Sequence, residues 1–234
     1  MSRLLHTLLR PALAAFVLLS LASTAWAQLK IEGTRLIYQG SAKEASINLV
    51  NRSDLDTVVQ SWVSSPDEGR DTPFAVVQPL ALIPPNGQQM LRVLYAGQGL
   101  PEDRESLFWL NILEIPRKPE QADTLQFAIR QRLKLFYRPP GLPGSASAAA
   151  DGLQWRTPQP GRIEVRNPSA FHVSLVDLRL DTPGQTQQLT GYLLLHPGQS
   201  LTLEAPSPLP AQRHLTFSEL TDIGLQKPHR IALP

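Results

Sequence analysis

The sequence predicts an all-β protein built from two β-sandwich domains. Apolar and polar residues alternate with a period of two in many short segments, which is the pattern of half-buried strands. Proline and glycine separate these segments, and they make up 22 and 14 of the 234 residues. Long segments with a 3.6-residue apolar period, which would indicate amphipathic helices, are missing.

Residues 1–27 have the pattern of a secretory signal peptide. Arg3 and Arg10 supply a basic start, an apolar run follows over 11–23, and Ala25-Trp26-Ala27 is a small-x-small cleavage site. We expect cleavage after Ala27. The apolar run is too short to span a bilayer comfortably, and no later segment is long and apolar enough to do so, so we expect the product to be soluble after export.

Composition excludes several classes of function. Removal of the leader takes two arginines and no acids, so the formal net charge falls from +2 to zero. A neutral chain does not indicate a nucleic-acid or membrane-surface binder. The chain has no cysteine, which excludes thiol catalysis, thiolate zinc sites and stabilisation by disulfides.

The first domain is expected over 28–138. Its predicted strands are 30–40, 44–53, 57–65, 74–87, 88–97, 106–116 and 125–140. Pro79 inside the fourth segment favours an edge or a switch of the strand between sheets. Seven strands in about 110 residues fit an immunoglobulin-like sandwich.

A linker and a second, smaller sandwich follow. Residues 139–150 are rich in Pro, Gly, Ser and Ala, which is typical of a domain boundary. The second immunoglobulin-like sandwich is expected over 151–234, with strands at 153–157, 161–167, 170–180, 187–197, 199–205 and 214–220. We find no sequence repeat between the two halves.

No catalytic or metal-binding pattern is found. The motifs G-x-S-x-G, H-E-x-x-H and the phosphate-binding loop do not occur. The four histidines beyond the leader lack metal-ligand spacing: His172, His196, His214 and His229. The acids Glu102, Asp103 and Glu105 are more typical of solvated or salt-bridged loop residues than of acid–base catalysts. We expect no enzyme activity, no cofactor and no metal.

The segment 125–140 has one apolar and one basic face. Odd positions are mostly apolar (Leu125, Phe127, Ile129, Leu133, Leu135 and Tyr137), and basic residues occupy even positions (Arg130, Arg132, Lys134 and Arg138). Two readings are open. The apolar face could belong to the protein's own core, or it could be presented to another protein. Alternation alone favours the core.

Three motifs in order resemble the periplasmic pilus-assembly chaperones. LPEDRESLFWLNILEIP, residues 100–116, is similar to that family's signature without a gap. GTRLIYQG at 33–40 resembles its first strand, and RLKLFYRPP at 132–140 resembles the end of its seventh strand. In the second half the resemblance rests on the weaker segments 161–175 and 219–224.

The resemblance implies two immunoglobulin-like domains set at an angle, like a boomerang, in a periplasmic protein. Such chaperones bind incomplete pilus or fimbrial subunits, lend them the seventh strand, and deliver them to an outer-membrane usher. Strand donation from chaperone to pilin is an established instance of β-strand addition. By position in the motif, Leu125, Phe127 and Ile129 would be the donated side chains, while Leu133 and Leu135 are assigned to neither role.

The resemblance also implies two groups of polar residues. Arg35 and Lys134 would anchor the C-terminal carboxylate of the subunit, and the hydroxyl of Thr34 could assist. The alternative is that both cations are solvated charges on a sheet face. Glu105, Arg138 and Asp222 would form an interdomain salt bridge.

Two details place the chain within the family. The connection over 117–124 is short, which resembles the short-loop branch that assembles rod-like or fimbrial pili. The family's second domain often carries a disulfide, whereas this chain has no cysteine.

Two other classes of protein are alternatives. An exported adhesin or sugar-binding sandwich would need an aromatic platform, but Trp62, Trp109 and Trp155 are scattered in the sequence. A hydrolase on a β-sandwich would need a nucleophile–base motif. For the unbound chaperone, an exposed apolar strand makes a self-capping homodimer a further hypothesis.

Overall fold

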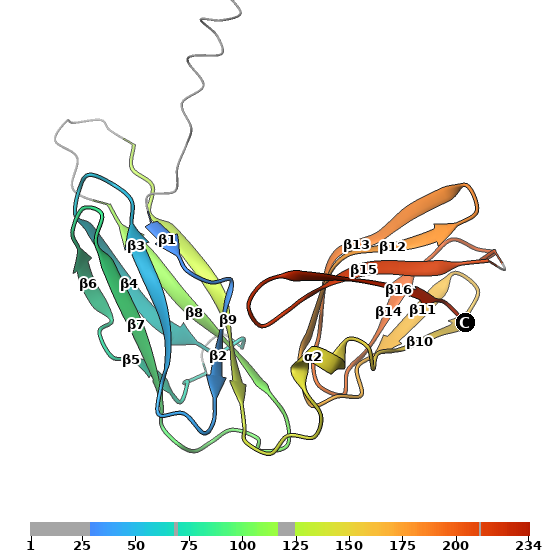
Figure 1. Cartoon of the computed structure of the whole chain (residues 1–234), viewed down its shortest axis with the longest axis horizontal. Coiled ribbons are helices and arrows are strands. Elements are labelled where there is room, and N and C mark those ends of the chain that lie inside the picture. Colours follow the sequence, from blue (N-terminus) through green and yellow to red (C-terminus); the bar gives the residue numbers. More distant parts are fainter. Residues whose placement is uncertain (1–28, 68–69, 117–124, 211) are drawn as a thin grey trace, which may run out of the picture.

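The computed structural model describes residues 29–67, 70–116, 125–210 and 212–234. These residues form two β-sandwiches that lie at an angle to each other, so the molecule has the shape of a boomerang (Figure 1). The expected signal peptide, its cleavage site and the short connection at 117–124 lie outside the described residues.

The first sandwich consists of two sheets. One sheet has the order β1-β3-β7-β5, with β1 at Leu29–Ile31, β3 at Ala45–Asn51, β7 at Gln88–Tyr95 and β5 at Phe74–Val76. The other has the order β2-β9-β8-β4-β6, with β2 at Arg35–Gln39, β9 at Ile129–Arg138, β8 at Ser106–Ile115, β4 at Thr57–Ser64 and β6 at Leu80–Ile83. Strands β2 and β9 are parallel, and the other pairs in both sheets are antiparallel.

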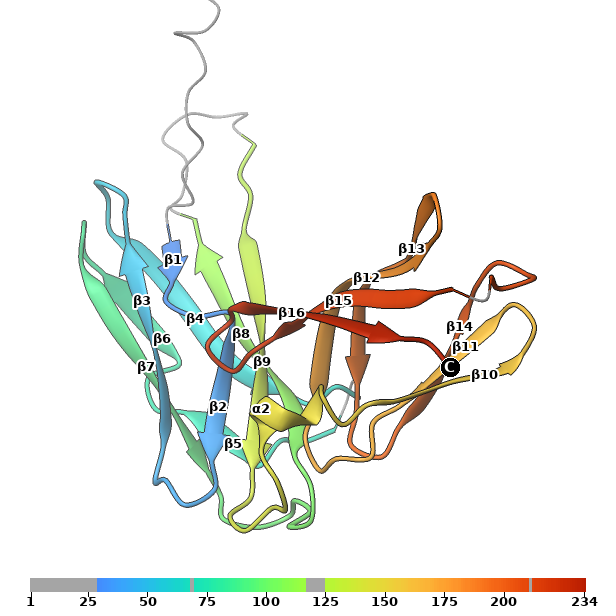
Figure 2. The same cartoon turned by 45° about the vertical axis from the view of Figure 1, so that its right-hand side comes forward.

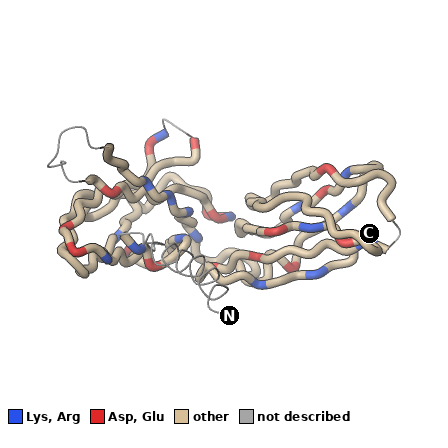
Figure 3. The backbone as a smooth tube through the Cα atoms, turned by 90° about the horizontal axis from the view of Figure 1, so that it is seen from above, with Lys and Arg blue, Asp and Glu red and all other residues tan. Residues whose placement is uncertain are grey.

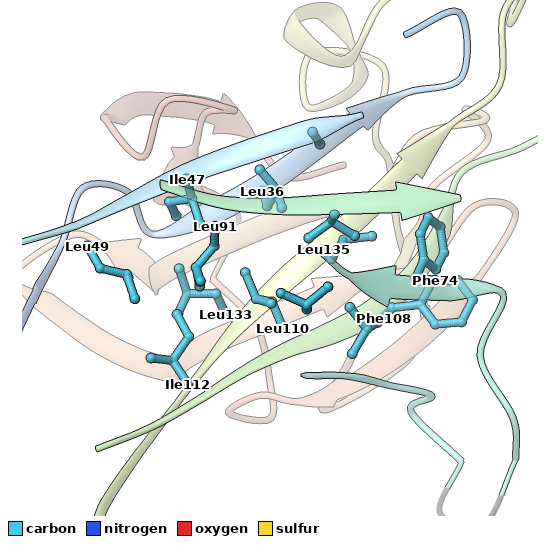
Figure 4. Close-up of a cluster of buried hydrophobic side chains, with 14 of the residues drawn as sticks. Leu36, Ile47, Leu49, Phe74, Leu91, Phe108, Leu110, Ile112, Leu133 and Leu135 are labelled. Carbon is cyan, nitrogen blue, oxygen red and sulfur yellow. The ribbon is translucent and has the colours of Figure 1, made fainter. Parts of the chain in front are cut away.

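Two predicted strands are each divided between the sheets. The segment 30–40 forms β1 and β2, and these pair with β3 and β9 respectively. The segment 74–87 forms β5 and β6 on either side of Pro79, where a switch of sheets was expected. The core lies between the sheets, where Leu91, Leu110 and Leu135 gather with other buried apolar side chains (Figure 4).

The second sandwich has a sheet of three strands and a sheet of four. The first has the order β10-β11-β14, with β10 at Gln154–Gln159, β11 at Arg162–Arg166 and β14 at Ser200–Glu204. The second has the order β13-β12-β15-β16, with β13 at Gln185–Leu195, β12 at Val173–Thr182, β15 at His214–Leu220 and β16 at Gln226–Ala232. Figure 2 shows the β15–β16 hairpin reaching from this domain toward β2 and β9.

Two features of the second half differ from the sequence expectation. Strand β16 was not predicted, because Pro228 and the polar residues around it hide the alternation that marks a strand. The end of the expected linker forms a helical turn, α2, at Ala146–Ala149. Ala149 and the following Ala150 are buried in the second core, so this turn packs as part of the second sandwich.

Each half contains a turn closed by a buried asparagine, a similarity that no sequence repeat revealed. Asn51 follows β3's last apolar residue, and its amide donates to the carbonyls of Leu55, Ile83 and Pro84. The Ser53 backbone and hydroxyl both donate to the Asn51 side-chain oxygen.

In the second domain, the Asn167 amide donates to the carbonyls of Phe171, Leu195 and His196. The Ser169 backbone and hydroxyl both donate to the Asn167 side-chain oxygen. Each sandwich thus has an Asn-x-Ser turn that ties a strand end to a neighbouring segment.

Candidate subunit-binding strand and interdomain cleft

The odd-numbered residues of the segment 125–137 have two environments. Leu133, Leu135 and Tyr137 are buried in the first core. Earlier in the chain, Leu125, Phe127 and Ile129 are exposed by 77%, 74% and 57%. Three large apolar side chains exposed at alternate positions form a patch of the kind that marks interaction surfaces.

The strand partners of β9 also change along its length. Strand β9 pairs with β8 over Ile129–Tyr137, but it pairs with β2 only over Lys134–Arg138. Strand β8 occupies one edge of β9 from Ile129 to Tyr137. The other edge has no strand partner over Ile129–Leu133 within the described residues, since β1 pairs with β3 in the other sheet.

The predicted strand is longer than the one in the structure. Residues 125–128 have no regular secondary structure, and β9 begins at Ile129. The physical reason is that pairing with β8 ends at Ile129, opposite Glu114. Leu125 and Phe127 therefore precede the ladder that the described residues of β8 and β9 form.

Arg35 and Lys134 are direct neighbours, as the sequence expectation placed them. They are register partners in the parallel pair β2–β9. The Arg35 Nη1 donates to the carbonyl oxygen of Leu220 at 2.9 Å, which ties this cation to the second domain. Burial lowers the pKa of Arg35. Among the effects that raise this pKa, the electrostatic interaction with Tyr192 is the largest. Arg35 also borders an interdomain cavity of about 270 Å³ lined by Phe136, His172 and Ile223.

Aromatic rings surround Lys134. Its Nζ lies 5.4 Å from the ring centroid of Trp109 on β8 and 4.7 Å from that of Tyr192 on β13. The guanidinium of Arg132 also contacts Trp109, and it lies 4.6 Å from the centroid of that ring. Sequence reasoning missed Tyr192, because nothing in its local pattern distinguishes it from other strand residues.

Thr34 lies against the second domain. A Cβ placed on Gly224 would come within 2.5 Å of the Thr34 hydroxyl oxygen. Gly224 also has a φ of +81°, a conformation that favours glycine. The turn between β15 and β16 thus requires glycine both for its shape and for its approach to Thr34.

Glu105, Arg138 and Asp222 form a salt-bridge network across the domain junction. The Arg138 Nε donates to the Glu105 carboxylate at 2.7 Å, and its Nη1 donates to Asp222 at 2.8 Å. The Glu105 side chain is only 2% exposed, whereas that of Asp222 is 41% exposed. Burial lowers the pKa of Arg138, but its hydrogen bonds and the nearby carboxylates outweigh this effect, so the pKa is raised overall.

Two histidines extend this network, which the sequence did not predict. The second oxygen of Glu105 accepts the backbone N–H of His172 at 2.7 Å and lies 3.2 Å from its Nδ1. The Nε2 of His172 lies 3.2 Å from the Nδ1 of His196. Burial lowers the pKa of His196, and the neighbouring His172 lowers it further. The described part of the chain has no group of three or more His, Asp or Glu residues placed to hold a metal ion.

The basic side of β9 is a local feature. Lys and Arg are interspersed with Asp and Glu along both domains (Figure 3). No helix in the described ranges is long and apolar enough to cross a membrane.

Two family models match nearly the whole length of the chain. Residues 28–143 match the model described as "Pili and flagellar-assembly chaperone, PapD N-terminal domain". Residues 148–231 match "Pili assembly chaperone PapD, C-terminal domain".

Individual relatives agree with these models. The chaperone protein FimB/FhaD of Bordetella pertussis is 40% identical over 78% of this chain and 80% of its own length. The chaperone protein LpfB of Salmonella typhimurium is 35% identical over 90% of this chain and 91% of its own length.

Solved structures show the same arrangement. The YadV chaperone has a TM-score of 0.78 at 30% identity, covering 88% of this chain and 100% of its own. A Salmonella enterica structure, described as SafA pilin in complex with the SafB chaperone, has a TM-score of 0.75 at 28% identity. That match covers 90% of this chain and 99% of the other.

Proposed function

The chain belongs to the family of pili-assembly chaperones with PapD-type N- and C-terminal domains, and on this premise we propose how it binds its partners. It is a fimbrial chaperone of the chaperone–usher pathway, and it binds pilus subunits by adding the segment Leu125–Leu133 to the subunit's sheet. It then passes the subunit to an outer-membrane usher.

The observation that supports this proposal is that the Ile129–Leu133 edge, which has no strand partner among the described residues, adjoins the exposed side chains of Leu125, Phe127 and Ile129. An incomplete sandwich exposes both unpaired backbone groups and an apolar groove, and an added strand satisfies both. Leu125, Phe127 and Ile129 are the donated side chains. Each would contribute roughly 1.5–3 kcal/mol on full burial.

Arg35 and Lys134 anchor the C-terminal carboxylate of the subunit. Within the described residues neither cation forms an ion pair with a carboxylate, so both can bind a carboxylate of the partner. Hydrogen bonds from two cations to one carboxylate are short and charge-assisted. The anchor also fixes the register, because a slip by one residue would turn the donated side chains away from the groove. Thr34, next to Arg35 in the sequence, supports the anchor through its hydroxyl.

The network of Glu105, Arg138 and Asp222 maintains the angle between the domains. A buried ion pair loses much of its attraction to desolvation, so we assign this network to orientation rather than to net stability.

The protein is periplasmic. We further propose that export ends with cleavage after Ala27. The mature chain would have domains at 28–138 and 151–234, with the linker at 139–150 ending in α2.

Co-purification from the periplasm tests this function. Wild type and variants are expressed with a fimbrial subunit encoded beside the chaperone, and the complex is measured by size-exclusion chromatography. We expect a soluble one-to-one complex for wild type. Phe127→Asp places a charge in the groove, and Lys134→Ala removes half of the anchor. Each variant should lose most of the subunit while keeping the wild-type unfolding midpoint.

Matched controls sit elsewhere on the first domain. Met90→Asp changes another exposed apolar residue, 56% exposed on β7, and Lys43→Ala removes another exposed lysine. Both should retain the complex. If folded Phe127→Asp and Lys134→Ala also retain it, the subunit binds to a different surface and the proposal is wrong.

A further inference from the structure

Tyr192 is held in a defined position on the second domain. It lies on β13 opposite Val176 of β12, and its residue exposure is 43%. The Thr190 hydroxyl donates to the Tyr192 carbonyl at 3.0 Å and accepts the Tyr192 N–H at 3.4 Å. These contacts fix the backbone from which the ring projects toward the first domain.

The ring meets Lys134 at a distance at which a cation and an aromatic face attract. The Lys134 Nζ is 4.7 Å from the Tyr192 centroid and 5.4 Å from the Trp109 centroid, and both values are within the usual limit of about 6 Å. Trp109 belongs to the same sheet as Lys134, whereas Tyr192 belongs to the other domain. The ammonium therefore has an aromatic contact on each side of the cleft.

A lysine needs such support to hold one position. Its four-carbon stem is flexible, and its rotamer freedom must be lost before the ammonium can bind a carboxylate at a fixed point. Arg35, the register neighbour of Lys134, is already oriented through its bond to the Leu220 carbonyl. For Lys134, aromatic rings have the corresponding role, and Tyr192 is the ring closer to its ammonium.

We propose that Tyr192 is a positioning residue that holds the Lys134 ammonium beside Arg35, where the two cations bind the subunit's C-terminal carboxylate. This inference rests on the proposed function and deepens it. Since Tyr192 comes from the second domain, the carboxylate site is complete only when the two domains keep their observed angle.

The test isolates the carboxylate from the rest of the subunit. The probe is a synthetic peptide with the sequence of a fimbrial subunit's C-terminal strand, made as the free acid and as the amide. Affinities of both for the mature full-length chaperone are measured by fluorescence anisotropy. For wild type we expect the acid to bind about 10–100-fold more tightly, as charge-assisted hydrogen bonds imply.

Two substitutions separate the ring from the hydroxyl. Tyr192→Leu removes the aromatic face, and we expect it to reduce the preference for the acid by about 3–30-fold. Tyr192→Phe keeps the ring, so it should retain the preference to within about 2-fold. The amide should bind all three proteins equally well, since strand addition does not involve Tyr192.

The outcomes distinguish this inference from the function on which it rests. If wild type itself binds acid and amide equally, the carboxylate anchor is wrong. If wild type prefers the acid and Tyr192→Leu prefers it equally, the anchor stands and the positioning role is overturned. Equal losses in Tyr192→Leu and Tyr192→Phe would also overturn it, because the hydroxyl would then bind the carboxylate directly.

Discussion

Asn51 and Asn167 are fully buried polar residues that each close a turn in one sandwich. Each amide donates to three backbone carbonyls, and each side-chain oxygen accepts from a serine two residues later. A buried polar group is tolerated only when its hydrogen bonds are satisfied, so the surrounding carbonyls depend on the asparagine.

Asn51→Ala should therefore lower the free energy of unfolding by about 2–4 kcal/mol, because it leaves several buried carbonyls without donors. Urea denaturation followed by tryptophan fluorescence measures the change. Asn48→Ala is the matched control. It removes only exposed hydrogen bonds to Glu32 and Gln88, and it should cost less than about 1 kcal/mol. A similar small cost for Asn51→Ala would contradict this role.

The odd-numbered face of the segment 125–137 is exposed at its start and buried at its end. Leu133 and Leu135 pack in the protein's own sandwich, while Leu125, Phe127 and Ile129 continue the same parity beyond it. The change occurs where pairing with β2 and then with β8 ends, so neighbouring strands rather than the sequence of this segment determine which residues remain exposed.

The buried and the exposed parts of the segment 125–137 should respond differently to truncation. Leu135 is fully buried, so Leu135→Ala should reduce the free energy of unfolding by about 2–5 kcal/mol. Phe127→Ala removes an exposed ring and should change stability by less than about 0.5 kcal/mol while weakening subunit binding. Chemical denaturation and subunit capture, measured on both variants, check this separation. Marked destabilisation by Phe127→Ala would place Phe127 in the protein's own core.

At the scale of the whole molecule, the domain junction is a connected set of charges and rings. Arg138 joins Glu105 of the first domain to Asp222 of the second, and Glu105 continues through His172 to His196. The proposed carboxylate site lies at the same junction, since Arg35 bonds to Leu220 and Lys134 contacts Tyr192. On this proposal, domain orientation and subunit recognition share one interface.

The lowered pKa of His196 predicts a pH dependence of stability. Between that lowered value and the ordinary pKa of 6.5, the unfolded chain binds more protons than the folded chain at this site. The contribution of His196 to the free energy of unfolding therefore decreases as pH falls below 6.5. Burial raises the pKa of Glu114, which acts in the opposite direction at lower pH.

Comparison of wild type with His196→Gln isolates the histidine from Glu114. We expect the difference in unfolding free energy between the two proteins to be constant above neutral pH. Below pH 6.5 the variant should lose less stability than wild type on acidification. Urea denaturation at a series of pH values measures this, and parallel curves for the two proteins would contradict the prediction.

The sequence by itself determined the fold class, most strands and the family. Alternation and turn residues are local signals, so segments such as 106–116 could be located without knowledge of their partners. Motif positions also located Arg35, Lys134, Glu105, Arg138 and Asp222.

Only the tertiary structure decided which surfaces these residues meet. Strand β16 exists because β15 supplies a ladder for it, although Pro228 breaks its local pattern. Phe127 is exposed and Leu135 is buried because the neighbouring strands end between them. Tyr192 reaches Lys134 only because one sandwich packs at an angle on the other. Contacts between distant segments have no local signal, which is why the sequence could not predict them.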